Sequence, residues 1–113
     1  MKTVFHVADG AADIQDAAMR YAKGIFDDES IEMDAVAVVA NASGIELVRS
    51  DSDYAEEIAD LSQGAVQFVA CEKSMQAAGL TRDDVLDVVE TAPTSVGELT
   101  RRQEDGYHYI KVP

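Results

Sequence analysis

The sequence has little cysteine and proline and no tryptophan: one cysteine and two prolines occur among 113 residues. The single cysteine, Cys71, excludes an intramolecular disulfide and a cysteine-rich zinc site. A chain of this kind is typical of a reducing compartment. Long apolar runs are also missing, since the longest covers residues 35–40 and a membrane-spanning helix needs roughly 20 residues. We therefore expect a cytoplasmic protein without a membrane segment.

Basic residues are scarce as well. Nine Lys and Arg face 22 Asp and Glu, which gives a formal net charge of −13. Such a charge repels nucleic-acid phosphates and anionic lipids, so we expect neither nucleic acid nor membrane as a partner. The acidic residues are spread along the chain as a solvated coat, which resembles proteins of salt-loving organisms. A halophilic source is a hypothesis that a rise in melting temperature from low to molar salt would support.

What the sequence does contain is an alternation of apolar strands and amphipathic helices. At 12.2 kDa and 47% hydrophobic residues, the chain fits one domain over residues 1–113. Apolar runs predict strands, and three- and four-residue spacing predicts helices. The expected strands cover 2–8, 33–40, 65–70, 87–91 and 107–112. The expected helices and helical turns cover 11–26, 53–63, 74–78, 82–86 and 95–105. Residues 45–48 fit either an extended segment or a helical turn.

This alternation predicts an α/β fold, namely a single three-layer α/β/α domain with a mostly parallel sheet of about five strands. Polar residues before several helices predict their starts. Asp53, Ser74 and Thr81 are expected caps, and Ser95 with Glu98 has the spacing of a capping box.

In an open parallel sheet, ligands and reactive groups collect at the carboxyl ends of the strands. The expected strands end near His6, Asn41, Cys71 and Thr91. We therefore predict that this edge carries the functional site. The candidate ligand-binding residues there are His6, Asp9, Asn41, Ser43, Lys73 and Ser74.

Cys71 is the one thiol at this predicted edge. A thiol reacts as its thiolate, and the N-terminus of a following helix lowers a thiol pKa. Lys73 favours the anion and Glu72 opposes it, so the direction of the shift stays open at the level of sequence. The alternative is a small, buried, unreactive cysteine that only packs.

No other motif specifies a chemistry. His6 fits a base or hydrogen-bond donor at the edge, or a packed side chain, and His108 fits packing or a subunit contact. Neither histidine has a partner at metal-ligand spacing, and the turn after the first strand lacks a glycine-rich phosphate loop. We expect no metal and no cofactor. A phosphorylated receiver domain is disfavoured because Cys71 stands where its phosphoacceptor aspartate would be, although Asp9, Thr91 and Lys111 fall loosely at its helper positions.

The segments 68–75, 79–81 and 85–86 around Cys71 resemble the DsrE/DsrF-like sulfur-relay family, and so do the closing segment 96–110 and the opening segment 4–7. The resemblance implies a small doubly wound domain that assembles into oligomers, often trimers or hexamers. It also implies, for some members, a cysteine that carries sulfur as a persulfide, and Cys71 matches that position.

The sequence thus supports two functions. In the first, Cys71 carries sulfane sulfur between donor and acceptor thiols, either as a sulfurtransferase or as a carrier, with partner proteins that supply and accept the sulfur. This hypothesis expects the Cys71 sulfur to be open to solvent in a cleft. In the second, the chain is a non-catalytic oligomeric module that binds a ligand or partner, and Cys71 is structural. A nucleotide-binding protein is a third, weakly supported class.

Overall fold

Five parallel strands form one sheet in the computed structural model, which describes residues 1–113. The sheet order is β4-β3-β2-β1-β5, so the chain builds outward from β1 to one edge and then crosses back to the other. The predicted α/β class and strand number are confirmed. The strands are β1 (Lys2–Val7), β2 (Ala35–Ala40), β3 (Val66–Cys71), β4 (Glu90–Ala92) and β5 (Tyr107–Val112).

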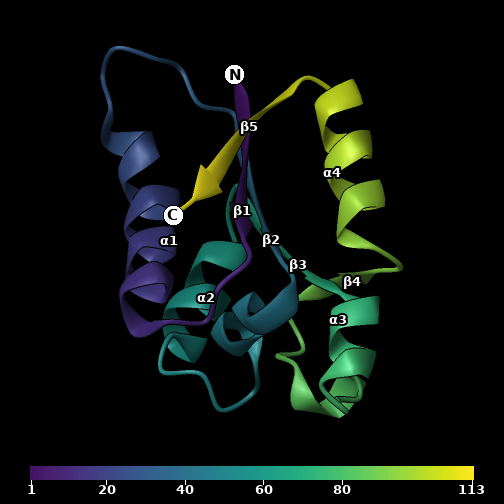
Figure 1. The fold of residues 1–113 in the computed structure, drawn as a ribbon. Coiled ribbons are helices and arrows are strands. Elements are labelled where there is room, and N and C mark those ends of the chain that lie inside the picture. The colour runs from purple at the N-terminus through teal and green to yellow at the C-terminus, as the bar shows by residue number, and fades with distance from the viewer.

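Helices cover both faces of this sheet. In Figure 1, α1 and α2 lie on one side of the strands and α3 and α4 on the other, which gives the three predicted layers. The stretch that the sequence left open forms part of a 3₁₀ segment, Ala42–Val48. The α-helices are α1 (Ala12–Gly24), α2 (Ala55–Ser62), α3 (Glu72–Ala77) and α4 (Ser95–Glu104), and the other 3₁₀ turns are Ile25–Asp27 and Arg82–Asp84.

The two faces of the sheet bury different amounts of apolar surface. Alternate strand residues such as Phe5 and Phe68 point to the side of α1 and α2, where a core of 20 buried residues forms. The opposite strand positions, including Val4 and Val69, meet Leu99 of α4 in a core of only six buried residues. The α4 face therefore depends more on polar contacts.

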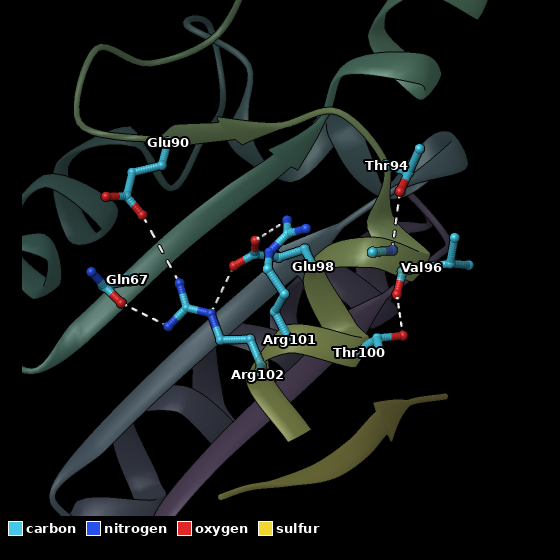
Figure 2. Close-up of polar contacts among 9 residues, drawn as sticks. Gln67, Glu90, Thr94, Val96, Glu98, Thr100, Arg101 and Arg102 are labelled. Atoms are coloured by element: carbon cyan, nitrogen blue, oxygen red, sulfur yellow. Dashed lines mark hydrogen bonds and ion pairs between the residues drawn. The ribbon is translucent and has the colours of Figure 1, made fainter. Parts of the chain in front are cut away.

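Those polar contacts centre on Arg102 near the end of α4 (Figure 2). Its Nε donates to Glu98 Oε2 at 2.7 Å, and its Nη1 donates to Gln67 Oε1 at 2.8 Å and to Tyr107 Oη at 3.0 Å. Arg102 and Glu98 are 12% and 13% exposed, so this ion pair is largely removed from water. The hydrogen bonds of Arg102 to Gln67 and Tyr107 join α4 to β3 and β5.

The fourth strand is displaced from its predicted position. The sequence placed it around Val88 and Val89, but β4 begins at Glu90. Val89 is buried outside the sheet ladder, where its carbonyl accepts from Arg82 Nη2 at 2.6 Å and its N–H donates to the Leu86 carbonyl. A buried valine in a loop and a buried valine in a strand give the same apolar pattern in the sequence. The predicted start of the fourth strand was wrong for this reason.

Several predicted caps also differ. Thr94 and not Ser95 caps α4, because its Oγ1 accepts from the Gly97 N–H at 3.0 Å, while Glu98 is taken by Arg102. Asp53 precedes the actual N-cap of α2, Tyr54. α3 begins at Glu72, so Ser74 lies inside the helix and does not cap it. The Thr81 turn is confirmed: its N–H donates to Asp84 Oδ2 at 2.8 Å.

No helix of the chain is both long and apolar enough to span a membrane.

Candidate functional site

Cys71 is the last residue of β3 and the N-cap residue of α3, at the carboxyl edge of the sheet. Its partner on β4 is Ala92, three residues before Ser95 at the start of α4. The backbone N–H groups of Ser74 and Ser95 lie in the first turns of α3 and α4, where intrahelical acceptors are lacking. The beginnings of two helices thus meet at the sulfur.

These surroundings decide the direction that the sequence left open for the Cys71 pKa. Burial of the thiol raises the pKa, but the hydroxyl and backbone N–H groups of Ser74 and Ser95 hydrogen-bond the anion and outweigh that effect. The net pKa of Cys71 is therefore below its ordinary value. Neither Glu72 nor Lys73 is among the causes of this shift, so uncharged dipoles stabilise the thiolate.

A line of hydrogen bonds reaches Ser95 from the far edge strand. His6 Nδ1 lies 2.7 Å from Tyr109 Oη, and His6 Nε2 lies 2.9 Å from Asn41 Oδ1. Asn41 Nδ2 then donates to Ser95 Oγ at 3.0 Å. Tyr109 belongs to β5, His6 to β1, and Asn41 follows β2. The residues of this line, with Cys71 at its end, form the polar edge chain: Tyr109, His6, Asn41, Ser95 and Cys71.

The loop after β2 is held tightly against this edge. The N–H of Ala42 donates to Ser74 Oγ at 2.8 Å, and Ala42 has a φ of 49°, a left-handed conformation that non-glycine residues rarely adopt. A Cβ at Gly44 would lie 2.1 Å from the Val7 carbonyl oxygen. Only glycine permits this approach, which fixes the loop beside the end of β1.

Comparison with known proteins identifies the family. A model of the DsrE/DsrF-like family matches residues 1–112. The chain belongs to the DsrE/DsrF-like family. The resemblance found in the sequence is thereby confirmed, and membership associates the chain with sulfur relay at the level of the family. No curated protein matches the chain.

Two solved structures share the fold of this DsrE/DsrF-like chain. MTH1491, a protein of unknown function from Methanobacterium thermoautotrophicum, is 28% identical, with a TM-score of 0.89 over 97% of each chain. BT1422, a conserved protein of unknown function from Bacteroides thetaiotaomicron, is 13% identical, with a TM-score of 0.70 over 98% of this chain and 94% of the other. The second likeness concerns the fold alone.

The predicted site residues separate into two groups in this DsrE/DsrF-like fold. His6 and Asn41 belong to the polar edge chain, and Ser74 contacts its terminal thiol. Asp9 and Ser43 instead stabilise the loop after β1, since Asp9 Oδ1 accepts from the Ala11 N–H and Ser43 Oγ from the Gly10 N–H. The remaining candidate, Lys73, is exposed on α3.

The expectation of an open sulfur is wrong for the single chain, because Cys71 is only 4% exposed. Its neighbours are not all aliphatic, however, since the hydroxyl and N–H groups of Ser74 and Ser95 lower its pKa. Ser74 also lines a surface hollow of about 340 Å³. Ser74 is therefore common to the lining of the hollow and to the groups that lower the pKa of the thiol. The hollow is bounded by Ala42, Ser43, Ile45, Glu46, Ser74, Ala77, Ala78 and Leu80.

Sequence reasoning missed Ser95 and Tyr109. Ser95 lies four residues beyond Thr91, near which the fourth strand was expected to end, and its expected role as a cap hid its relation to the thiol. Tyr109 lies midway along an edge strand, where nothing in the sequence pointed to His6. No group of three or more His, Cys, Asp or Glu side chains is arranged to hold a metal ion, and His108 is exposed on β5.

Proposed function

We propose that this chain is a sulfur-relay protein that carries sulfane sulfur as a persulfide on Cys71. The observation that carries the proposal is the lowered pKa of Cys71, which the donors on Ser74 and Ser95 produce. A thiolate is the nucleophile that sulfur transfer requires. Family membership over residues 1–112 supports the same chemistry.

The transfer has two balanced steps. The Cys71 thiolate attacks the outer sulfur of a donor persulfide, so a Cys71 S–S bond forms, the donor S–S bond breaks and the donor leaves as a thiolate. An acceptor thiolate then attacks the outer sulfur on Cys71, and the Cys71 thiolate is released. The sulfane sulfur moves without net oxidation or reduction. Because Cys71 is the only cysteine, the acceptor belongs to another subunit, another protein or a small thiol.

The low exposure of Cys71 adds a requirement to this mechanism. At 4% exposure the sulfur is not open to a donor, and we propose that movement of Ser74, which lines the neighbouring hollow and is among the groups that lower the pKa of the thiol, gives access to it. Rotation of one serine side chain is a small, fast motion. Between transfers, the same cover would protect the persulfide from unrelated thiols.

The test is intact-mass measurement after incubation with glutathione persulfide. We expect an increment of about 32 Da, one sulfur atom, that disappears after reduction by dithiothreitol. The matched control is Cys71→Ser, which keeps a small polar side chain and removes the sulfur. A wild-type protein that stays at its original mass under these conditions contradicts sulfur carriage.

The 4% exposure of Cys71 favours a second candidate, a non-catalytic oligomeric module that binds a ligand or partner and uses Cys71 for packing. The rate of alkylation by iodoacetamide separates the two. A carrier reacts in native buffer with a pH midpoint below that of a free thiol, whereas a structural cysteine reacts only after unfolding. Light scattering of the native protein tests the proposed trimer or hexamer in either case.

A further inference from the structure

The polar edge chain has a direction, and that direction bears on the reactivity of Cys71. The Asn41 side chain presents Oδ1 to His6 Nε2 at 2.9 Å and Nδ2 to Ser95 Oγ at 3.0 Å. A carboxamide oxygen only accepts, so His6 Nε2 must carry a hydrogen. In a neutral imidazole, Nδ1 is then the acceptor for the Tyr109 hydroxyl, 2.7 Å away.

The same logic continues toward the sulfur. Ser95 Oγ receives a hydrogen from Asn41 Nδ2, so its own proton is free to point to another acceptor. Cys71 pairs with Ala92, three residues before Ser95, and the Ser95 hydroxyl is among the groups that lower the pKa of the thiol, so the sulfur is the acceptor that we assign to this proton. The hydrogens between Tyr109 and Ser95 are thus all donated toward Ser95.

We propose that His6 is a positioning residue for Cys71: its Nε2–H holds the Asn41 carboxamide in the orientation that directs the Ser95 hydroxyl proton onto the sulfur. The opposite arrangement is well defined. With hydrogen on Nδ1, the Asn41 carboxamide would turn over, Ser95 would donate to Asn41, and Ser95 would present a lone pair to the sulfur. A lone pair disfavours a thiolate, so the tautomer of His6 and the ionisation of Cys71 are linked.

This link works through orientation and not through charge. Between His6 and the sulfur the chain consists of a carboxamide and a hydroxyl, which carry no net charge. The titratable neighbours of His6 are Tyr109 and Lys111, its register partner on β5. Glu72 and Lys73 follow Cys71 along the chain, and neither is among the causes of its shifted pKa. The inference rests on the proposed function, for which the thiolate is the active form.

The first test reads the tautomer directly in the wild-type protein. Long-range ¹H–¹⁵N spectra distinguish imidazoles with hydrogen on Nε2 from those with hydrogen on Nδ1. The chain has two histidines, and a His108→Gln variant assigns the signals. We expect His6 to carry its hydrogen on Nε2. A dominant Nδ1–H tautomer for neutral His6 would overturn the proposal.

The second test follows the ionisation of Cys71. Because Cys71 is the only cysteine, a ¹³Cβ-cysteine label gives one resonance whose shift reports the thiolate fraction against pH. We expect Ser95→Ala to reduce the thiolate fraction at neutral pH by about tenfold, since a hydrogen bond to the anion is lost. His6→Leu should reduce it by about threefold or more, because Asn41 is no longer held.

The decisive comparison is His6→Gln, because a glutamine N–H can replace Nε2–H as donor to Asn41. We expect the glutamine variant to titrate like wild type and the leucine variant to differ. His108→Leu, on the exposed part of β5, is the matched control and should titrate like wild type. Identical Cys71 titrations in His6→Leu and wild type would contradict the proposal.

Tyr109→Phe serves if His6→Leu does not fold. It removes only the hydroxyl that contacts Nδ1 of His6, from a side chain that is 41% exposed. We expect a smaller loss of thiolate than in Ser95→Ala and a partial appearance of the Nδ1–H tautomer. An unchanged tautomer and titration in this variant would also count against the proposal.

The mass test with glutathione persulfide is independent of these titrations. Absence of the sulfur increment with the expected titrations would reject sulfur carriage and leave the positioning role standing.

Discussion

Helix α4 has a polar cluster at each end. Charged side chains form one cluster, and uncharged hydrogen-bonding groups beside a thiol form the other. Near its C-terminus, Arg102 and Glu98 form an ion pair, and Arg102 also donates to Gln67 (Figure 2). A further hydrogen bond joins Arg102 to Tyr107. At its N-terminus, Ser95 receives a hydrogen bond from Asn41 and lies against Cys71, with no ion pair. Both clusters lie on the face of the sheet with the smaller apolar core.

The difference separates a stabilising cluster from a reactive one. In the ion pair, each charge is neutralised by a partner on the same helix, and the hydrogen bonds of Arg102 to Gln67 and Tyr107 attach α4 to β3 and β5. At the thiol, dipoles stabilise a negative charge without a resident cation. A sulfur anion held in this way keeps its electron pair available for attack on a donor persulfide. Variants at the two ends should therefore affect different properties.

The largest effect on stability is expected for Arg102→Met, which leaves the largely buried Glu98 carboxylate without its closest partner. Removal of one member of a buried pair typically costs about 3 kcal/mol. The free energy of unfolding in urea measures the loss. The matched control is Arg101→Met, since Arg101 also contacts Glu98 but is 60% exposed, and its loss should cost less than about 1 kcal/mol. Equal losses would show that the pair does not dominate this end of α4.

The second effect is a dependence of stability on acid. Burial raises the pKa of Glu98, but hydrogen bonds from Arg102 and Arg101 outweigh burial and hold the pKa below its ordinary value of 4.5. The stabilisation is therefore complete above about pH 4.5 and is lost as the pH falls through the lowered pKa of the folded protein. We expect the stability advantage of wild type over Glu98→Gln to shrink across that window.

Asp28 and Asp34 also have lowered pKa values, through hydrogen bonds from Ser30 and from the N-terminal ammonium. Both aspartates are present in wild type and in Glu98→Gln, so the difference in the free energy of unfolding between the two proteins reports on Glu98 alone. Unfolding in urea at pH 7 and at pH 3 measures it. An advantage that stays constant between these two pH values would contradict the assignment.

A smaller loss is expected at the other end of α4. Thr94 Oγ1 accepts from the Gly97 N–H at 3.0 Å, and loss of such a cap costs about 1 kcal/mol. Thr94→Ala should therefore lower the free energy of unfolding by about this amount, while Thr94→Ser keeps the cap and restores most of it. Urea unfolding of the two variants provides the comparison. A serine variant as unstable as the alanine variant would argue against the cap.

The sequence predicted the frame of the molecule because its central strands are apolar on both faces. The strands predicted over 33–40 and 65–70 lie within two residues of the observed bounds of β2 and β3. The fourth strand was misplaced because Val89 is buried in a loop, and four carbonyl groups there accept from Arg82. These contacts span only three to seven residues, but no apolar periodicity marks an arginine that organises a loop in this way.

The site was predictable only through the strand-end rule, namely that reactive groups collect at the carboxyl ends of parallel strands. That rule brought His6, Asn41 and Cys71 to one edge, where the structure has them. It did not reveal Tyr109, because a strand register between β1 and β5 brings that residue to His6. Burial of the thiol was expected only under the structural alternative for Cys71, since exposure depends on how the chain returns over the sheet, which periodicity does not encode.

The smallest effect concerns the thiol itself, which adds stability with rising pH as Glu98 does, but in the range below pH 9.0. Burial raises the pKa of Cys71, but the Ser74 and Ser95 donors lower it by more than burial raises it. The net pKa of Cys71 therefore lies below the ordinary value of 9.0. Its contribution to stability is complete above about pH 9 and is lost as the pH falls through the pKa of the folded protein. Wild type should thus gain stability relative to Cys71→Ala as the pH rises from 7 toward 9.

Thermal unfolding of the two proteins across this range measures the gain. Tyr54 has a raised pKa, mainly through burial, and it acts equally in both proteins, so it cancels in the difference. In a Ser95→Ala background the same pair should show a weaker dependence on pH, because one donor to the anion is gone. A gain unchanged by Ser95→Ala would mean that Ser74 alone stabilises the thiolate, and the contrast between the two ends of α4 would then no longer hold.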